Sequence, residues 1–182
     1  MNLPADFITS TKPLLGEQWN SFVEALDGES PTSIRINNRK ITSDSSLSKV
    51  PWCENGFYLD KRPQFTFDPL FHAGCYYVQE ASSMFIGRAL KQYASSSIKV
   101  LDLCAAPGGK STLIADFLDE GSLLVSNEVI RSRANILSEN VTKWGNPNTI
   151  VANNDPSRIG KLKGFFDMVL VDAPCSGEGM FR

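Results

Sequence analysis

Several features that would assign a chain to a class are missing from these 182 residues. No apolar run approaches the roughly 18 to 20 residues that a membrane-spanning helix needs. The segment from Met1 to Asp6 lacks the basic and apolar regions of a secretory signal peptide. We therefore expect a cytoplasmic protein that is not held in a membrane.

Metal-binding patterns and an excess of positive charge are missing as well. The chain has four cysteines and one histidine, and none of the cysteines form a C-x-x-C pair. Structural zinc sites use such pairs, so we expect no metal and reduced thiols. The net charge is -2 and the sequence pI is about 5.4. Any contact with RNA or DNA must therefore come from local basic patches or from protein outside these residues. The composition leaves the oligomeric state open.

Residues 1–75 predict a small α+β domain. Apolar residues recur at helical spacing up to Gly28 and indicate an amphipathic helix. Residues 33–37 alternate between polar and apolar side chains, which predicts a strand, and residues 57–59 predict another. The basic residues of this region are candidates for phosphate contacts, although scattered basic side chains are more often solvated: Arg35, Arg39, Lys40, Lys61 and Arg62.

Residues 76–182 show a different rhythm, in which strands alternate with helices. The predicted strands are 98–103, 123–127, 149–152 and 166–171, and the predicted helices are 79–90, 110–118 and 131–144. This alternation predicts right-handed βαβ units and a parallel, Rossmann-like sheet of which the chain contains the first four strands. The fourth strand is continuously apolar, which is typical of a strand covered on both faces. Ligands bind such sheets beyond the carboxyl ends of the strands.

The turn after the first of these strands is built from small residues. Small side chains let the backbone approach a ligand closely, and the following helix offers free N–H groups. We predict that this turn binds a cofactor through the residues Cys104, Ala105, Ala106, Pro107, Gly108, Gly109 and Lys110.

A P-loop is the alternative interpretation of the same turn. Gly109-Lys110-Ser111 matches the end of the P-loop motif, and Asp172 after an apolar strand resembles its magnesium-binding partner. However, the motif requires glycine where this chain has Cys104. Pro107 also removes a backbone donor that a phosphate cradle would use. A nucleotide hydrolase is thus the second hypothesis.

Two acidic residues follow the second and third strands. Glu128 lies about twenty residues beyond the glycines, where a carboxylate can accept hydrogen bonds from ribose hydroxyls. Asp155 can accept a hydrogen bond from an adenine amino group, or it can cap the helix that Pro156 begins. An adenosine site of this kind fits NAD, ATP and S-adenosylmethionine equally.

The end of the fourth strand combines a carboxylate with a thiol, Asp172 and Cys175. A thiolate that adds to C6 of a pyrimidine makes C5 nucleophilic, and an acid near N3 stabilises the charge that develops. We predict that Asp172 and Cys175 are catalytic. The alternative is a buried cysteine beside a helix-capping aspartate.

Long stretches of the sequence resemble one enzyme family. CAAPGGK at residues 104–110 and DAPCSGEGMFR at residues 172–182 resemble motifs of the RNA (cytosine-5)-methyltransferases of the Nop/Sun group, and most of all their bacterial branch that modifies small-subunit ribosomal RNA. Residues 33–37, 51–53 and 79–84 extend the resemblance along the whole chain.

The resemblance implies an S-adenosylmethionine cofactor, held by residues 104–110 together with Glu128, Asp155 and Asp172. It implies 5-methylcytosine in RNA as the product, with ribosomal RNA as the substrate. Cys175 would assist release of the methylated base, whereas a second cysteine in a Thr-Cys motif attacks C6. It also implies that polar residues of 79–83 face the cofactor pocket and that residues 1–75 help to bind RNA.

The chain departs from the family pattern because it ends at Arg182 and contains no Thr-Cys motif. We therefore expect a fragment that binds the cofactor but does not turn over by itself. A non-catalytic RNA-binding or assembly protein on a methyltransferase scaffold is the third hypothesis.

Overall fold

The computed structural model describes residues 3–42, 46–94 and 97–174 of the chain. Contacts between residues divide these into two compact units. One contains the N-terminal residues up to Pro31, and the other comprises Thr32–Ala173. Each unit is described by itself below.

The N-terminal unit consists of two short helices. Helix α1 (Ala5–Leu15) is followed by the 3-10 turn η1 (Gly16–Gln18) and by α2 (Trp19–Asp27). The sequence predicted one amphipathic helix, but Gly16 adopts a positive φ of 53° and interrupts it. Phe22 contacts the rings of Phe7 and Trp19, with centroid distances of 6.4 and 6.0 Å. As predicted, the second helix ends at Gly28.

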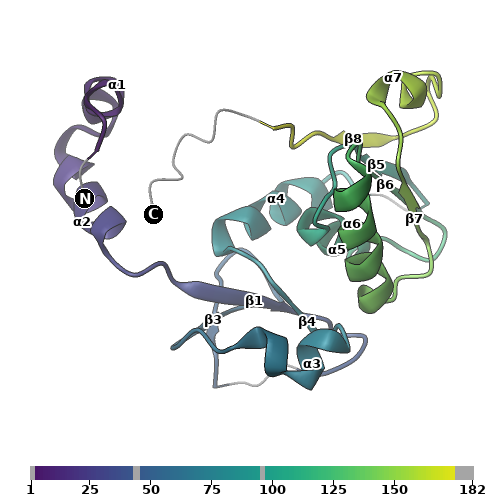
Figure 1. Cartoon of the computed structure of the whole chain (residues 1–182), viewed down its shortest axis with the longest axis horizontal. Coiled ribbons are helices and arrows are strands. Elements are labelled where there is room, and N and C mark those ends of the chain that lie inside the picture. Colours follow the sequence, from purple (N-terminus) through teal and green to yellow (C-terminus); the bar gives the residue numbers. More distant parts are fainter. Residues whose placement is uncertain (1–2, 43–45, 95–96, 175–182) are drawn as a thin grey trace. The chain divides into compact units, whose positions relative to one another are not determined.

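The second unit begins with an antiparallel sheet of four strands, β1 (Thr32–Ile36), β2 (Ser48–Lys49), β3 (Gly56–Leu59) and β4 (Tyr76–Val78), in the order β2-β3-β1-β4. A 3-10 turn η2 (Phe65–Phe67) and the short helix α3 (Pro69–His72) connect β3 to β4 (Figure 1). Ile34 and Ile36 lie on one face of β1 and pack against Phe57 and Tyr76. This confirms the predicted strand at residues 33–37.

The position of β4 bears on the expected boundary after residue 75. Tyr76, Tyr77 and Val78 pair with β1, so a boundary at that point would separate β4 from its sheet. The contact pattern instead groups both sheets within Thr32–Ala173. Division of the chain into domains 1–75 and 76–182 therefore stays a prediction.

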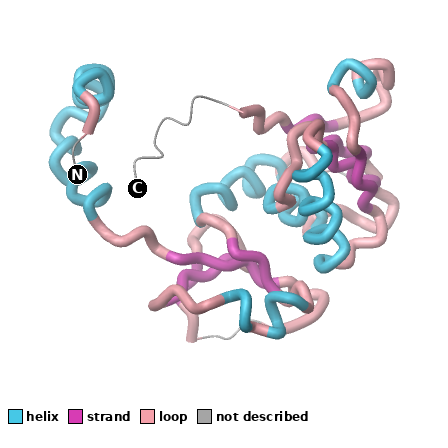
Figure 2. The backbone as a smooth tube through the Cα atoms, viewed as in Figure 1, coloured by secondary structure: helices cyan, strands magenta, loops and turns pink. Residues whose placement is uncertain are grey.

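The parallel sheet follows, with the strand order β7-β6-β5-β8. Figure 2 shows the strands of both sheets in magenta and the helices in cyan. Its strands are β5 (Lys99–Asp102), β6 (Leu123–Asn127), β7 (Thr149–Ala152) and β8 (Met168–Leu170). Its helices are α4 (Ala81–Lys91), α5 (Gly109–Ala115), α6 (Arg131–Trp144) and α7 (Pro156–Ile159). All neighbouring strands are parallel. The predicted Rossmann-like order of strands and helices is confirmed.

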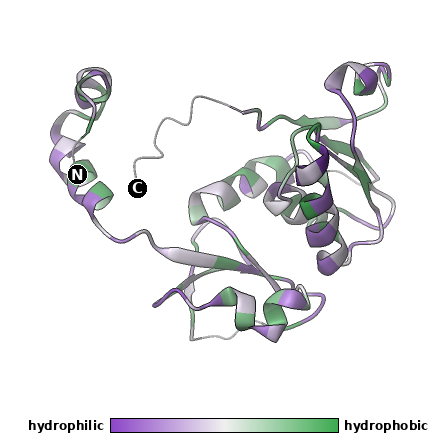
Figure 3. Ribbon diagram, viewed as in Figure 1, coloured by the Kyte–Doolittle hydropathy of each residue, from purple (hydrophilic) through white to green (hydrophobic). Residues whose placement is uncertain are grey.

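Strand β8 differs from the sequence-based expectation. Its residues are hydrophobic along its length (Figure 3), which predicted a strand covered on both faces. In the described sheet β8 pairs only with β5, and Val169 is 53% exposed. The apolar side chains of β8 are therefore suited to packing against protein on both faces of the strand. The described residues do not supply all of that packing.

Buried clusters show how the two sheets of the second unit are joined. One cluster fills the space beneath the parallel sheet and includes Val100, Ile114, Leu124 and Trp144. A second cluster joins residues that follow β2 to α4 and α5. Its members are Val50, Cys53, Ala81, Met84 and Leu113. Apolar packing thus continues from the antiparallel sheet to the helix that follows the small-residue turn.

Candidate functional site

The carboxyl ends of the four parallel strands meet at one edge of the sheet. Asp102 at the end of β5 is paired with Ser126 of β6 on one side and with Leu170 of β8 on the other. Asn127 is paired with Ala152 of β7. The turns that follow these strands must therefore lie close together, as the topology predicts.

The turn of residues 104–109 is held by hydrogen bonds from its neighbours. The Ala105 amide donates to the Asn127 carbonyl at 2.8 Å, and the Gly108 amide donates to the Ala105 carbonyl at 2.8 Å. Two side chains of α6 donate to the turn, Arg133 to the Ala106 carbonyl at 2.9 Å and Asn140 to the Pro107 carbonyl at 2.8 Å. The backbone of the turn is thus fixed without help from a ligand.

The glycines of the turn are required for different reasons. Gly108 has a φ of 112°, a conformation that residues with a side chain rarely adopt. A Cβ atom on Gly109 would lie 3.3 Å from the Tyr77 ring, closer than most such contacts. Gly108 therefore permits the backbone conformation of the turn, and Gly109 permits the close approach of the turn to Tyr77.

A pocket of about 210 Å³ opens beside this turn. Six residues of the predicted cofactor loop line it, namely Cys104, Ala105, Ala106, Pro107, Gly109 and Lys110. Asp172 also lines it, as do Tyr77, Val78, Gln79, Glu80 and Ser83 from β4 and the start of α4. This arrangement agrees with the expectation that polar residues of 79–83 face the pocket. Two larger cavities, of about 640 and 320 Å³, lie elsewhere and contain none of the loop residues.

Lys110 and Asp172 form an ion pair across the pocket. The Nζ of Lys110 lies 2.6 Å from Oδ2 of Asp172, and the side chains are 26% and 56% exposed. Because this pair is open to solvent, its contribution to stability is small. Its consequence is geometric, since it joins the first turn of α5 to the residues after β8.

Glu128 lies at the end of β6 but outside the lining of the pocket. The residue is 2% exposed. Its Oε1 accepts a hydrogen bond from the Ile130 amide at 3.0 Å, and its Oε2 lies 3.6 Å from Arg133. A buried acid at a strand end, with one oxygen only loosely paired, retains capacity to accept hydrogen bonds.

Asp155 is exposed, lies outside the pocket lining and caps α7. Its Oδ1 accepts hydrogen bonds from the backbone amide and the hydroxyl of Ser157, at 2.8 and 2.6 Å. These bonds, from the hydroxyl first, lower the pKa of the Asp155 carboxyl. The capping alternative that the sequence left open is therefore present in the structure. Both bonds go to Oδ1. They do not test a role of Asp155 in cofactor binding, which stays a prediction.

The described cysteines, Cys53, Cys75 and Cys104, are free thiols. Burial raises the pKa of the Cys104 thiol, and the nearby carboxylate of Glu128 raises it further. A thiol held in its protonated form is a poor nucleophile, which argues against a covalent role for Cys104. Cys175, the predicted catalytic thiol, lies outside the described residues.

Sequence reasoning missed three polar residues behind the turn. Asn127 is fully buried; its side-chain amide donates to the carbonyls of Leu103 and Asn154, so it joins three strand ends. Arg133 bridges the turn and Glu128. Asp102 is 1% exposed and accepts a hydrogen bond from Ser111 at 2.7 Å. A polar residue that ends an apolar strand is the signal that would have found Asn127 and Asp102.

The Asp102 carboxyl is the most perturbed acid near the pocket. Burial raises its pKa to about 6, while the Ser111 hydroxyl acts in the opposite direction. No described residue donates a hydrogen bond to its buried Oδ1. A buried acceptor without a donor is costly, so this oxygen is suited to a donor or a positive charge from a ligand.

Two of the five candidates for phosphate contacts, Arg35 and Lys40, are directed at the protein. Arg35 is fully buried, with 0% exposure, and its guanidinium pairs with Asp116. The Lys40 ammonium is directed at the protein as well, because it donates to the Ala73 carbonyl at 2.6 Å. Neither side chain is arranged to meet an RNA backbone.

The described residues contain neither a metal-binding cluster nor a membrane-spanning helix. Among them, no group of three or more histidine, cysteine or acidic side chains is placed to hold a metal ion. Within the same residues, no helix combines the length and the apolar character that crossing a bilayer requires.

Comparison with known proteins identifies related chains. Residues 3–81 match the family model of the N-terminal domain of 16S rRNA methyltransferase RsmF, and residues 89–182 match that of 16S rRNA methyltransferase RsmB/F. Ribosomal RNA small subunit methyltransferase F of Vibrio cholerae is 38% identical over 100% of this chain. The chain spans 42% of the length of that relative.

Solved structures show the same fold. A methyltransferase homolog protein from Pyrococcus horikoshii superimposes with a TM-score of 0.82 at 31% identity, covering 98% of this chain and 61% of that one. NSun6 from the same organism, determined with SFG, has a TM-score of 0.77 at 18% identity, over 94% of this chain and 71% of its own. These likenesses confirm a methyltransferase fold and favour it over the P-loop hypothesis. The chain therefore belongs to the 16S rRNA methyltransferase RsmB/F family.

Proposed function

We propose that this chain supplies the S-adenosylmethionine site of an enzyme that methylates C5 of cytosine in RNA, and that the RNA is ribosomal and the enzyme cytoplasmic. The observation that carries the proposal is the pocket at the carboxyl edge of the parallel sheet, lined by the turn of residues 104–110 and by Asp172. Family membership supports methyl transfer to ribosomal RNA. Cytosine and its C5 atom rest on the motifs around Asp172 and Cys175.

The residues around the turn fit the charge of this cofactor. S-adenosylmethionine carries a sulfonium, an ammonium and two ribose hydroxyls, all of which favour carboxylates as neighbours. The strand ends supply Asp102, Glu128, Asp155 and Asp172, and Oδ1 of Asp102 is a buried acceptor that no described residue satisfies. A triphosphate would instead need free cations. Lys110, the lysine that a P-loop would use, is already paired with Asp172.

We assign roles to these residues from their places at the strand ends and from the resemblance of their motifs. The turn of residues 104–110 holds the cofactor, Glu128 accepts hydrogen bonds from the ribose, and Asp155 accepts one from the adenine. When bound, the cofactor supplies the methyl group. Asp172, whose carboxylate accepts a hydrogen bond from Lys110, is the acid that we assign to stabilising charge on the pyrimidine ring. Cys175 assists release of the methylated base, and these 182 residues contain no Thr-Cys motif, which by resemblance holds the thiol that attacks C6.

Calorimetric titration of the chain with S-adenosylmethionine tests the cofactor site. We expect binding, and we expect Glu128→Gln to weaken it about tenfold because one charged acceptor is lost. Glu139→Gln, at an exposed position of α6, is the matched control and should bind like the unaltered chain. No binding of S-adenosylmethionine or S-adenosylhomocysteine, together with a thermal shift in Mg·ATP, would instead favour a nucleotide hydrolase.

The reaction itself is tested with the gene product that contains this chain. Digestion of methylated RNA to nucleosides should yield 5-methylcytidine on mass spectrometry. In that protein Cys175→Ala should leave the methylated base attached, so that a covalent protein–RNA adduct accumulates. Methylation at another atom, or full turnover without an adduct in Cys175→Ala, would contradict the proposal.

A further inference from the structure

The polar face of strand β1 is directed into the protein. Side chains two residues apart lie on the same face of a strand, and Ser33, Arg35 and the following Asn37 are 3%, 0% and 1% exposed. In a sheet with one solvated face these positions would meet water. Here they contact Gln79, which follows β4, Thr112 of α5 and Trp144 at the end of α6.

Arg35 reaches from this face to both sides of the cofactor pocket. Its Nε donates to Oε1 of Gln79 at 3.0 Å. Its terminal nitrogens donate to the Thr112 hydroxyl at 2.5 Å and to the Gly109 carbonyl at 3.4 Å. Gln79 and Gly109 both line the pocket. One buried guanidinium thus connects two of its walls.

Thr112 extends the connection into the turn. Its hydroxyl lies 2.8 Å from the Gly108 carbonyl, to which it donates, while it accepts from Arg35. Thr112 is 2% exposed and does not line the pocket. The left-handed residue of the turn, Gly108, is therefore linked to Arg35 through a single side chain.

Gln79 is held by hydrogen bonds with two residues of β1, Ser33 and Arg35. The backbone amide of Gln79 donates to the Ser33 carbonyl at 3.2 Å, and its backbone carbonyl accepts from the Ser33 hydroxyl at 2.6 Å. Because its Oε1 accepts from Arg35, its Nε2 is the group left beside Gly109. Arg35 therefore determines that a donor, rather than an acceptor, is presented at this wall of the pocket.

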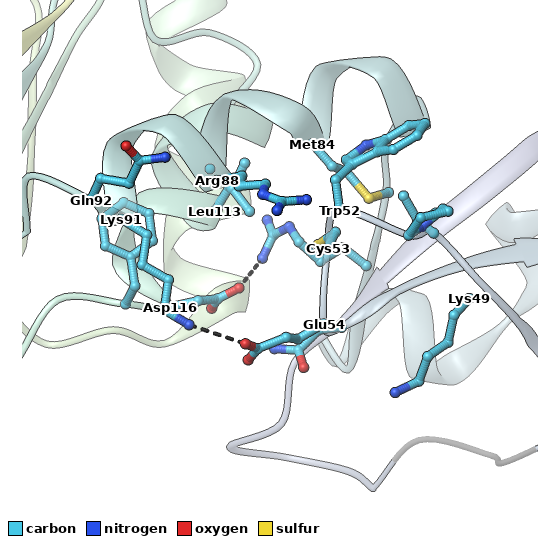
Figure 4. Close-up of a pocket in the computed structure, with 16 residues that line it drawn as sticks. Lys49, Trp52, Cys53, Glu54, Met84, Arg88, Lys91, Gln92, Leu113 and Asp116 are labelled. Carbon is cyan, nitrogen blue, oxygen red and sulfur yellow. Dashed lines mark hydrogen bonds and ion pairs between the residues drawn. The ribbon is translucent and has the colours of Figure 1, made fainter.

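The charge of Arg35 is balanced on the side away from the pocket. Asp116 of the turn after α5 forms an ion pair with it, and the Trp144 indole donates to the other oxygen of Asp116 at 2.9 Å. The guanidinium also lies 4.4 Å from the centroid of the Trp144 ring. Figure 4 looks into the 640 Å³ cavity that borders this pair, with Asp116 and Leu113 on the α5 side and Trp52, Cys53 and Glu54 on the other.

We propose that Arg35 is a positioning residue of the cofactor site: from the antiparallel sheet it fixes the turn of residues 104–110, through Gly109 and Thr112, and the amide of Gln79. The antiparallel sheet is then part of the methyl-donor site. The binding consequence rests on the proposed function, whereas the effect on the turn does not. Arginine suits this task because its planar fork donates in several directions at once, which a lysine ammonium on a flexible stem cannot reproduce.

The test compares three variants of the chain. Arg35→Lys keeps the charge opposite Asp116 but loses the fork. Thr112→Val removes the hydroxyl that links Arg35 to Gly108 and leaves the ion pair intact. Asn37→Ala is the matched control, because Asn37 is equally buried on the same face of β1 and donates to the Gly74 and Trp144 carbonyls, away from the pocket.

Two measurements separate positioning from general stability. Hydrogen exchange of residues 104–112 should become about tenfold faster in Arg35→Lys and Thr112→Val, and should change in Asn37→Ala only as far as its global stability changes. The Kd for S-adenosylhomocysteine should rise about tenfold in the first two variants and stay the same in the control.

Each outcome decides the inference. Unchanged exchange and unchanged Kd in Thr112→Val and Arg35→Lys would overturn it, as would a loss in Asn37→Ala equal to theirs. If Arg35→Lys does not fold, Thr112→Val decides alone by the same measurements. If the unaltered chain does not bind S-adenosylhomocysteine while exchange of the turn still responds to Thr112→Val, the positioning stands and the proposed function fails.

Discussion

The antiparallel and parallel sheets of Thr32–Ala173 contribute to the candidate site in opposite ways. The parallel sheet supplies the chemistry, because its strand ends carry the turn of residues 104–110 and the acids Glu128 and Asp172. The antiparallel sheet supplies one wall of the pocket and the buried side chains behind it. Motif recognition finds the first contribution and part of this wall, but it overlooks the buried side chains behind the wall, because they carry no reactive group at the pocket.

The largest expected effect comes from breaking the buried pair between the two regions. Arg35→Met leaves the carboxylate of Asp116, whose side chain is only 18% exposed, without its partner and should lower the free energy of unfolding by about 3–5 kcal/mol. Urea denaturation followed by circular dichroism measures the change. Arg39→Met, at an exposed position three residues beyond β1, should change it by less than about 0.5 kcal/mol. Equal losses in both variants would show that the two regions are not joined through Arg35.

A second contact between the regions depends on the absence of a side chain. Gly74 has a φ of 67°, and a Cβ atom there would lie 2.0 Å from the Lys143 carbonyl oxygen at the end of α6. Gly74→Ala should therefore cost about 2–4 kcal/mol, from overpacking and backbone strain together.

The control for Gly74 is Gly145, which has a comparable φ of 82° but no atom closer than 3.7 Å to the added Cβ. Gly145→Ala should cost about 1 kcal/mol, from the conformation alone. Thermal or urea unfolding of both variants compares them. A Gly74→Ala variant no less stable than Gly145→Ala would mean that the close approach to α6 is absent in solution.

The parallel sheet makes its own prediction through Asp102. Its pKa is raised to about 6 in the folded protein, above the value of 3.8 for a free side chain. The folded state therefore keeps a proton that the unfolded state has lost, so stability falls as pH rises from about 4 to above 6. At about 1.4 kcal/mol for each pKa unit, the loss reaches up to about 3 kcal/mol.

Urea denaturation between pH 4 and pH 7.5 measures this slope. Asp102→Asn should flatten it, because an amide cannot ionise, whereas Asp60→Asn at an exposed position serves as the control for the change in charge. A slope that is the same in the unaltered chain and in Asp102→Asn would show that this carboxyl is not buried as described.

The smallest expected effect concerns an exposed link between the same two regions. Lys91 of α4 lies 3.2 Å from Glu54 of the antiparallel part, but the side chains are 59% and 84% exposed. Water and salt weaken such a pair, so Lys91→Ala should change the free energy of unfolding by less than about 0.5 kcal/mol. A loss above 1 kcal/mol in urea denaturation would contradict the view that buried groups, rather than surface charges, join the sheets.

The sequence predicted local structure well wherever one period dominated. Residues 123–127, 131–144 and 149–152 form the predicted elements without any shift in their bounds. The interruption at Gly16 was missed, because the apolar spacing continues across it while the backbone does not. The sequence also could not place β4, whose three residues show no pattern and become a strand only by pairing with β1.

The candidate site was predictable in part for a similar reason. Small residues and acids at strand ends identify a cofactor edge, since parallel topology alone brings those ends together. Which groups share a pocket depends on distances in space. The structure unites most of residues 104–110 with Asp172 and Gln79, while Glu128 and Asp155 stay outside that lining.

By itself, the sequence determined the order of strands and helices, the turn of small residues and the family, because these depend on spacing and residue type along the chain. Only the tertiary structure decided the fate of Arg35. Alternation in residues 33–37 fixes which side chains share a face of β1, but it does not state whether that face meets water or protein. Arg35, a candidate for a phosphate contact on sequence alone, is instead buried against α5 and Trp144.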